Sequence, residues 1–137
     1  SVCSPSNSDM PSKIGKPVSE IHKPVPGYKD QMSDKVDRLI RNLKPGKPLK
    51  RFNWSIQPHG DLYWKADAGV KEERHQKHWR VERQTLLRLP STNAIVFGIR
   101  VFLHSFSAMA KIPGFDNAIA AIIERLPTEQ SVYKNLL

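Results

Sequence analysis

The pattern of apolar and polar residues predicts a long β-hairpin in the centre of the chain. Residues 79–89 alternate with a period of two, which is typical of a strand. Residues 94–103 alternate too, and their apolar face consists of Ile95, Phe97, Ile99, Val101 and Leu103. The turn-prone tetrapeptide at 90–93 separates the two stretches, so we expect them to pair.

Five polar residues interrupt this hairpin: Glu82, Gln84, Arg88, Arg100 and His104. They are too many for a plain core, so one face meets solvent or lines a polar pocket. Glu82 and its neighbouring arginines form either a structural ion-pair network or a site where arginine binds a carboxylate and glutamate handles a proton or an amine. The register is open as well, because a two-residue loop places Gln84 opposite Ile99 and a three-residue loop places it opposite Arg100.

Helical periodicity flanks the hairpin on both sides. An amphipathic helix is predicted over residues 28–43, a second helix over 115–126 and a shorter one from 128, which buries Val132 and Leu136. A helical turn is expected over 17–21, and strands over 49–57 and 62–64. Residues 1–12 read as irregular and 65–77 as a mobile loop. This order predicts an α+β fold, with helices packed on an antiparallel sheet that contains the long central hairpin.

Composition excludes several classes of protein. With 137 residues, 39% of them hydrophobic, the chain fits one soluble domain, and no apolar run approaches the roughly 18–20 residues that span a bilayer. The single cysteine, Cys3, excludes an internal disulfide or a cysteine-built metal cluster. Because the chain begins with Ser1 rather than Met and no signal-peptide pattern follows, we expect a fragment or a processed product.

The net charge of +9 raises the question of a nucleic-acid partner. The lysines are spaced singly and not in a block, which favours a solvated basic face. An exposed aromatic platform is not evident either, because Phe52, Trp54 and Phe97 all fall on core-like faces. We therefore expect no nucleic acid and no membrane among the partners.

The five histidines are His22, His59, His75, His78 and His104. The spacing of the pair at 75 and 78 does not announce the further ligands that a zinc site needs. His22 precedes a segment stiffened by two prolines and a glycine, which either fixes the ring at a site or makes an ordinary loop. His104 is in phase with Arg100 on the hairpin and is a second candidate for a functional role.

An ordered set of segments resembles the haem-dependent oxidative N-demethylase-like family: KIGKPVSEIHKPVPGY, VDRLIRNL, RFNWSI, RVERQTLLRLP and AIVFGIRVFL. The most specific parts are Ile-His-x-Pro-Val-Pro at residues 21–26 and Arg-Gln-Thr-Leu-x-Arg-Leu-Pro at residues 83–90. Some relatives carry His before Arg-Gln, where this chain has Glu82.

The resemblance implies a PAS-like fold that binds haem b and uses dioxygen to oxidise an N-methyl group of a small amine, with release of formaldehyde. Electrons come from a separate reductase. Family members are longer, so residues 1–137, which fit a single domain by their length, are expected to be the C-terminal part of a longer haem-binding domain. The single cysteine suits a reducing compartment, so a cytoplasmic location is expected. The alternative is a non-catalytic PAS-like haem-binding or interaction module.

Haem needs an apolar slot, an axial donor and cations for its propionates. For the iron we choose His22 over Cys3, with His104 as the runner-up. Arg83, Arg88 or Arg100 is expected to supply the cations for the propionates, and Glu82 and Arg100 are the expected catalytic residues. The apolar face of residues 97–101 and the helix at 36–43 are expected to form the slot.

Overall fold

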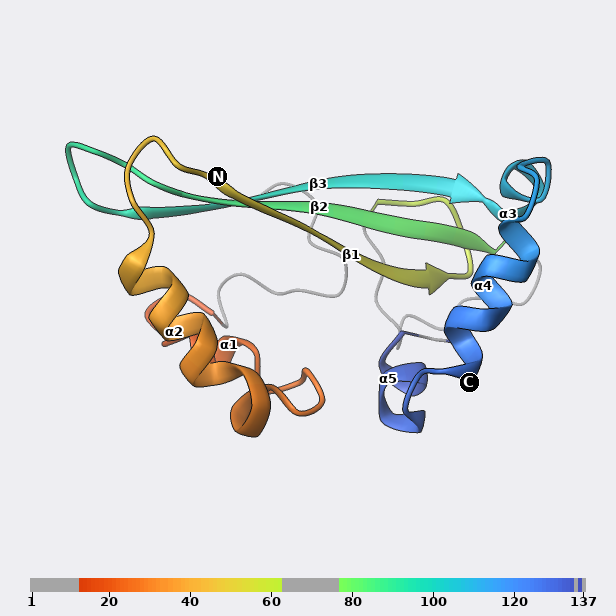
Figure 1. Cartoon of the computed structure of the whole chain (residues 1–137), viewed down its shortest axis with the longest axis horizontal. Coiled ribbons are helices and arrows are strands. Elements are labelled where there is room, and N and C mark those ends of the chain that lie inside the picture. The colour runs from red at the N-terminus through yellow and green to blue at the C-terminus, as the bar shows by residue number, and fades with distance from the viewer. Residues whose placement is uncertain (1–12, 63–76, 135, 137) are drawn as a thin grey trace. The chain divides into compact units, whose positions relative to one another are not determined.

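The computed structural model describes residues 13–62, 77–134 and 136. Its three strands are β1 (Leu49–Gln57), β2 (His78–Arg88) and β3 (Ile95–Ser105), and they form one antiparallel sheet in the order β1-β2-β3 (Figure 1). The strand at 49–57 has its predicted bounds, and the central hairpin is confirmed. Among the described residues, no helix is long and apolar enough to cross a membrane.

The hydrogen bonds at both ends of the hairpin define its register. Next to the turn, Leu89 N–H donates to Ala94 O at 2.9 Å, and at the far end Phe106 N–H donates to Lys77 O at 3.0 Å. Both bonds belong to the same pairing, so one register holds from end to end. This pairing places Gln84 opposite Ile99, the register that the shorter loop predicts.

The register also sorts the polar side chains by face, because residues alternate along each strand and directly opposed residues share a face. Glu82, Gln84 and Arg88 lie on one face of β2, which we call the polar face. Arg83 lies on the other face and has Arg100 directly opposite it on β3. The sheet therefore separates Glu82 from the arginine pair.

The chain divides into two compact units, and all three strands contribute to both. The α2 unit comprises residues 17–53 and 81–102, and the described part of the α4 unit comprises 13–16, 54–62, 77–80, 103–134 and 136. The expectation of a single domain over the whole chain stays a prediction.

The α2 unit contains the short helix α1 (Val18–Ile21), the π-helical turn η1 (Tyr28–Met32) and α2 (Ser33–Asn42). The helix predicted over 28–43 thus begins with a wider turn. Gly27 has a φ of 70°, which glycine adopts without the steric cost of a side chain and which turns the chain into η1. Tyr28 and Leu43 are buried at the two ends of this helical region.

The α4 unit contains α3 (Phe106–Met109), α4 (Phe115–Glu124) and α5 (Thr128–Tyr133). Its core is aromatic: the ring centroid of Trp79 lies 4.9 Å from that of Phe115 and 6.0 Å from that of Trp54. Lys134 covers the Trp54 ring with its ammonium group, 4.5 Å from the centroid. The two C-terminal helices were predicted, whereas α3 lies in a stretch without apolar periodicity.

Three burial predictions are wrong. Phe52 and Phe97 have exposed fractions of 64% and 46%, because their strands are edge strands whose side chains are only partly covered. Val132 is 57% exposed, because α5 turns Ser131 inward instead. Residues 1–12 with Cys3, most of the predicted strand at 62–64 and most of the loop at 65–77 with His75 lie outside the described residues.

Candidate functional site

His22 is held by its own helix and by an aromatic neighbour. Its Nδ1 lies 2.8 Å from the carbonyl oxygen of Val18. The ring stacks on Tyr28, with centroids 4.7 Å apart and planes inclined by 12°. A carbonyl oxygen can only accept, so Nδ1 must carry the hydrogen, and in the neutral ring the lone pair is then on Nε2. The local fold thus selects the tautomer in which Nε2 can bind a metal.

Tyr28 brings a buried polar atom to the same place. Its side chain is 5% exposed, and its hydroxyl has no hydrogen-bond partner among the described residues. Burial raises the pKa of Tyr28 above its usual value of 10.0, as does the Asp37 carboxylate to a smaller extent, while the Arg51 guanidinium acts in the opposite direction. The phenol is therefore neutral at physiological pH and can donate a hydrogen bond.

A chain of hydrogen bonds leads from Arg51 to Glu82 across the polar face. Arg51 Nε donates to Gln84 Oε1 at 2.6 Å, and Gln84 Nε2 donates to Glu82 Oε2 at 3.1 Å. Gln84 is 6% exposed, so the link in the middle is buried. This leaves the two terminal nitrogens of Arg51 without a hydrogen-bond partner among the described residues, in an orientation that Gln84 fixes.

Tyr28 and Arg51 are not among the site residues predicted from the sequence. Tyr28 follows the Pro-Val-Pro-Gly segment next to His22, where the pattern predicts the start of a helix. Arg51 lies on the face of β1 opposite to Phe52 and Trp54, the aromatic residues that predict the strand. The alternation itself placed Arg51 on a polar side of the sheet, so the signal was present.

Arg88 has a structural position. Its Nε donates to Leu43 O and its Nη2 to Ile40 O, both at 2.6 Å, so it caps the C-terminus of α2. Its Nη1 reaches Asn93 in the hairpin turn, with Oδ1 at 2.7 Å. A propionate would have to compete with these contacts for the same guanidinium.

Three further predicted site residues are Arg83, Arg100 and His104. Arg83 and Arg100 are neighbours on the opposite face of the hairpin, where the Arg100 guanidinium lies 5.1 Å from the Phe102 ring centroid. His104 is exposed and belongs to the α4 unit. The structure thus stacks His22 on Tyr28 and links Arg51 to Glu82 through Gln84, and the Arg51 guanidinium lowers the pKa of Tyr28.

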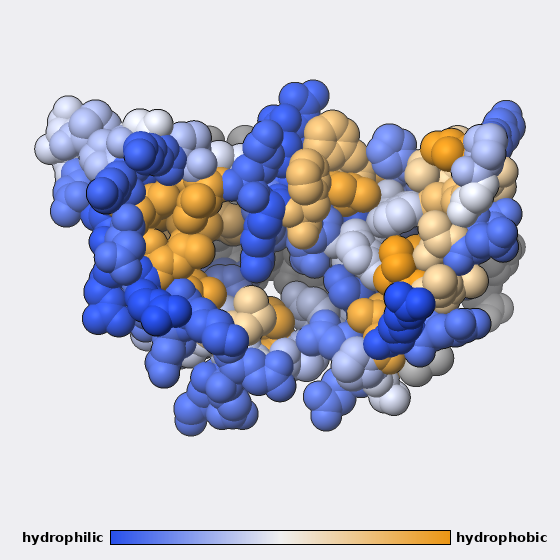
Figure 2. Space-filling model, in the orientation of Figure 1, coloured by the Kyte–Doolittle hydropathy of each residue, from blue (hydrophilic) through white to orange (hydrophobic). Residues whose placement is uncertain are grey.

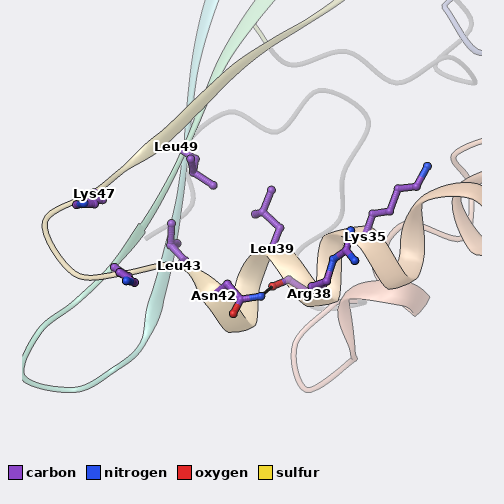
Figure 3. A pocket seen from close by; sticks show the side chains of 8 residues that line it. Lys35, Arg38, Leu39, Asn42, Leu43, Lys47 and Leu49 are labelled. Atoms are coloured by element: carbon purple, nitrogen blue, oxygen red, sulfur yellow. Dashed lines mark hydrogen bonds between the residues drawn. The ribbon is translucent and has the colours of Figure 1, made fainter.

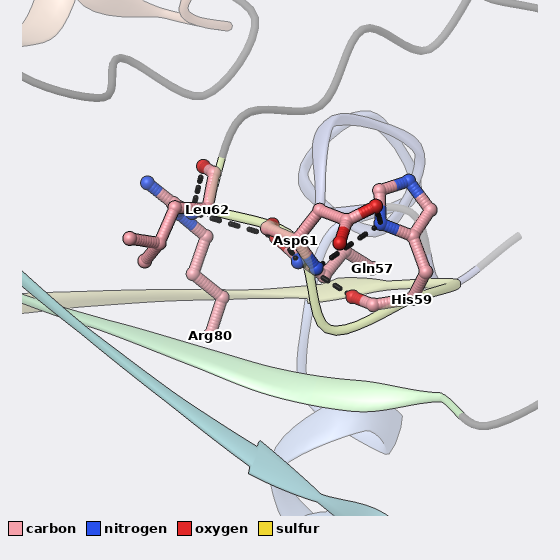
Figure 4. Close-up of polar contacts among 5 residues, drawn as sticks. All are labelled: Gln57, His59, Asp61, Leu62 and Arg80. Atoms are coloured by element: carbon pink, nitrogen blue, oxygen red, sulfur yellow. Dashed lines mark hydrogen bonds and ion pairs between the residues drawn. The ribbon is translucent and has the colours of Figure 1, made fainter.

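A second polar cluster surrounds the turn after β1 (Figure 4). Gln57 Nε2 donates to His59 O at 2.6 Å and to Asp61 O at 2.8 Å, and the buried Arg80 donates to Leu62 O at 3.1 Å. In these contacts side chains donate to main-chain carbonyl oxygens of the turn. The cluster therefore stabilises the turn after β1 and holds it against Arg80 of β2. His59 is a turn residue here, as expected. Among the described residues, no group of three or more His, Cys, Asp or Glu side chains could hold a metal ion.

We compared the sequence with known protein families. A sequence profile of the haem-dependent oxidative N-demethylase, alpha subunit-like family matches residues 1–137. The chain belongs to this family. The resemblance seen in the sequence is confirmed, and the family description carries haem dependence and the status of a subunit. The description names no residue, so the roles of individual side chains are argued from the structure.

Proposed function

We propose that this chain is the haem-binding subunit of an oxidative N-demethylase that acts on a small N-methylated amine. The observation that carries the proposal is the state of His22: its Nδ1–H is engaged by Val18 O, and Nε2 has no hydrogen-bond partner among the described residues. Haem iron takes an imidazole nitrogen as its axial ligand in many proteins, and a hydrogen bond at the other ring nitrogen increases the basicity of the ligand.

The residues around His22 fit the remaining needs of haem b. Tyr28 supplies an aromatic surface and a hydroxyl that can donate a hydrogen bond to a propionate. Arg51 supplies the cation, and its free terminal nitrogens suit a carboxylate. We therefore assign the first propionate to Tyr28 and Arg51. Arg83 and Arg88 stay predictions as propionate partners, and His104 stays a prediction as the alternative ligand of the iron. Arg88 is the weakest of these candidates because its guanidinium already donates to Ile40, Leu43 and Asn93.

Haem, when bound, supplies the iron at which dioxygen oxidises the N-methyl group, so that the methyl carbon leaves as formaldehyde and the second oxygen atom leaves as water. The chain's own contribution is to bind and orient. The half-buried Glu82 carboxylate, which Gln84 orients, is suited to hold a protonated amine near the cofactor. Arg100 keeps its predicted catalytic role as a proposal. Electrons come from a separate reductase, and the PAS-like arrangement of the sheet is part of the same proposal.

Turnover tests this function. The haem-loaded protein is supplied with dimethylamine, oxygen and an electron-transfer system of ferredoxin, its reductase and NADPH, and formaldehyde is measured. We expect formaldehyde in proportion to the NADPH consumed, and at least about tenfold less from Glu82→Gln at equal haem content. Haem that binds and is reduced without formaldehyde from any of a panel of N-methyl amines would identify a non-catalytic haem-binding module instead.

A further inference from the structure

A groove with a volume of about 640 Å³ lies along α2 and the segment that leads into β1 (Figure 3). Its apolar part consists of Leu39, Leu43 and Leu49. Leu43 is buried, but Leu39 and Leu49 are each 42% exposed. Figure 2 shows hydrophobic surface beside α2 with hydrophilic residues at its border. The groove therefore exposes apolar surface to water, and a partner can bury this surface.

Four cations surround these leucines: Lys35, Arg38, Lys44 and Lys47. Among the described residues, Asn42 is the one further lining residue, its Nδ2 donates to Arg38 O at 2.8 Å, and no acidic residue lines the groove. Of the acidic residues of α2, Asp37 falls on the other side of the helix by its 3.6-residue period, whereas Asp34 precedes Arg38 by one turn and lies beside the rim. The described lining residues nevertheless carry four positive charges and no negative charge, which favours an acidic partner.

This groove is not a haem site. The part of the chain that the structure describes lines it with no imidazole, thiolate, thioether or phenolate for the iron. It is also open and long and runs along a helix, which suits a segment of a protein better than an enclosed small molecule.

We propose that the α2 groove is the docking site for an acidic partner protein, which lays the apolar side of an amphipathic helix on Leu39 and Leu49 while its carboxylates meet the surrounding lysines and Arg38. Burial of leucines supplies affinity, and the charges select the partner and fix its register. The contact uses none of the four residues proposed to hold haem and substrate, which are His22, Tyr28, Arg51 and Glu82, although Leu39 belongs to the helix that the sequence suggested for the haem slot.

The test uses a fluorescently labelled synthetic helix with leucine at positions i, i+3, i+4 and i+7 and glutamate elsewhere. Binding to the full chain is followed by fluorescence anisotropy at low ionic strength. We expect saturable binding that weakens with salt. Arg38→Glu with Lys47→Glu should weaken it at least about tenfold, and Leu39→Ser at least about threefold.

The matched control is Arg41→Glu with Lys50→Glu, which makes the same change of net charge outside the groove and should alter the affinity less than threefold. Circular dichroism verifies that each variant is folded. Absence of binding, or an equal loss in both double variants, overturns the proposal. Binding of dodecanoate at the groove without binding of the helix also overturns it, in favour of a lipid carboxylate. The assay contains no haem, so its failure is distinct from failure of the proposed function.

Discussion

The hydroxyl of Tyr28 stands out among the single side chains, because burial without a partner costs free energy in the folded state. Tyr28→Phe removes that cost and keeps the ring against His22. We expect the free energy of unfolding of the haem-free protein to stay equal or to rise by up to about 1 kcal/mol. Urea unfolding at pH 8 measures it. A loss of more than about 1 kcal/mol would show that the hydroxyl has a stabilising partner.

The raised pKa of Tyr28 gives a second prediction. Between the unfolded pKa of 10.0 and the higher folded value, the unfolded chain releases this proton and the folded protein keeps it. The contribution of the protonated Tyr28 phenol to the free energy of unfolding is thus complete below pH 10, and it is lost as the pH rises through the folded pKa of Tyr28. Urea unfolding at pH 9 and pH 11 should show a larger loss of stability in wild type than in Tyr28→Phe. Equal losses would contradict the assignment.

Among the secondary-structure elements, Arg88 connects the end of α2 to the hairpin turn. Arg88→Ala removes charge-assisted hydrogen bonds to Ile40 O and Leu43 O, and we expect it to cost about 2–3 kcal/mol of unfolding free energy. Arg88→Lys keeps the charge but not the fork of donors, so it should recover less than half of the loss. Arg83→Ala is the matched control, an arginine on the same strand outside these contacts, and should cost under about 1 kcal/mol. Similar losses at both positions would refute the capping role.

These elements also show what the sequence can predict. Alternation over 49–57, 79–89 and 94–103 predicts the strands, because a period of two over such a length is typical of a strand. The π-helical start at Tyr28 and the short α3 carry no periodic signal of their own. Side-chain burial is harder still: Phe52 and Phe97 look like core residues, yet an edge strand leaves them exposed.

The candidate site was predictable only in part. His22 stood out because two prolines and a glycine follow it, and Glu82 because it interrupts an apolar ladder. Arg51 is linked to Glu82 through a hydrogen bond to Gln84 that joins two strands 33 residues apart in sequence, and local patterns do not encode such a contact. Alternation along β2 separates Arg83 from Glu82, whereas the face of Arg100 relative to Glu82 depends on the strand register, which the turn left undecided.

For the whole molecule, the proposal places haem in one of the two units. His22, Tyr28, Arg51 and Glu82 all belong to the α2 unit. Haem binding should therefore slow amide hydrogen exchange chiefly within residues 17–53 and 81–102, because a ligand stabilises the segments that it contacts against local opening. Exchange followed by mass spectrometry, with and without haem, measures this. Protection concentrated in residues 103–134 would favour His104 as the ligand instead.

The assignment of His22 as the axial ligand of haem is tested most directly by the absorption spectrum of the haem-loaded chain in the ferric and ferrous states. The spectrum is recorded for wild type, His22→Gly and His104→Gly. We expect a defined Soret band in wild type and His104→Gly, its loss or shift in His22→Gly, and its recovery when free imidazole is added to that variant. A Soret band that His22→Gly leaves unchanged in a folded protein would contradict the assignment of the axial ligand.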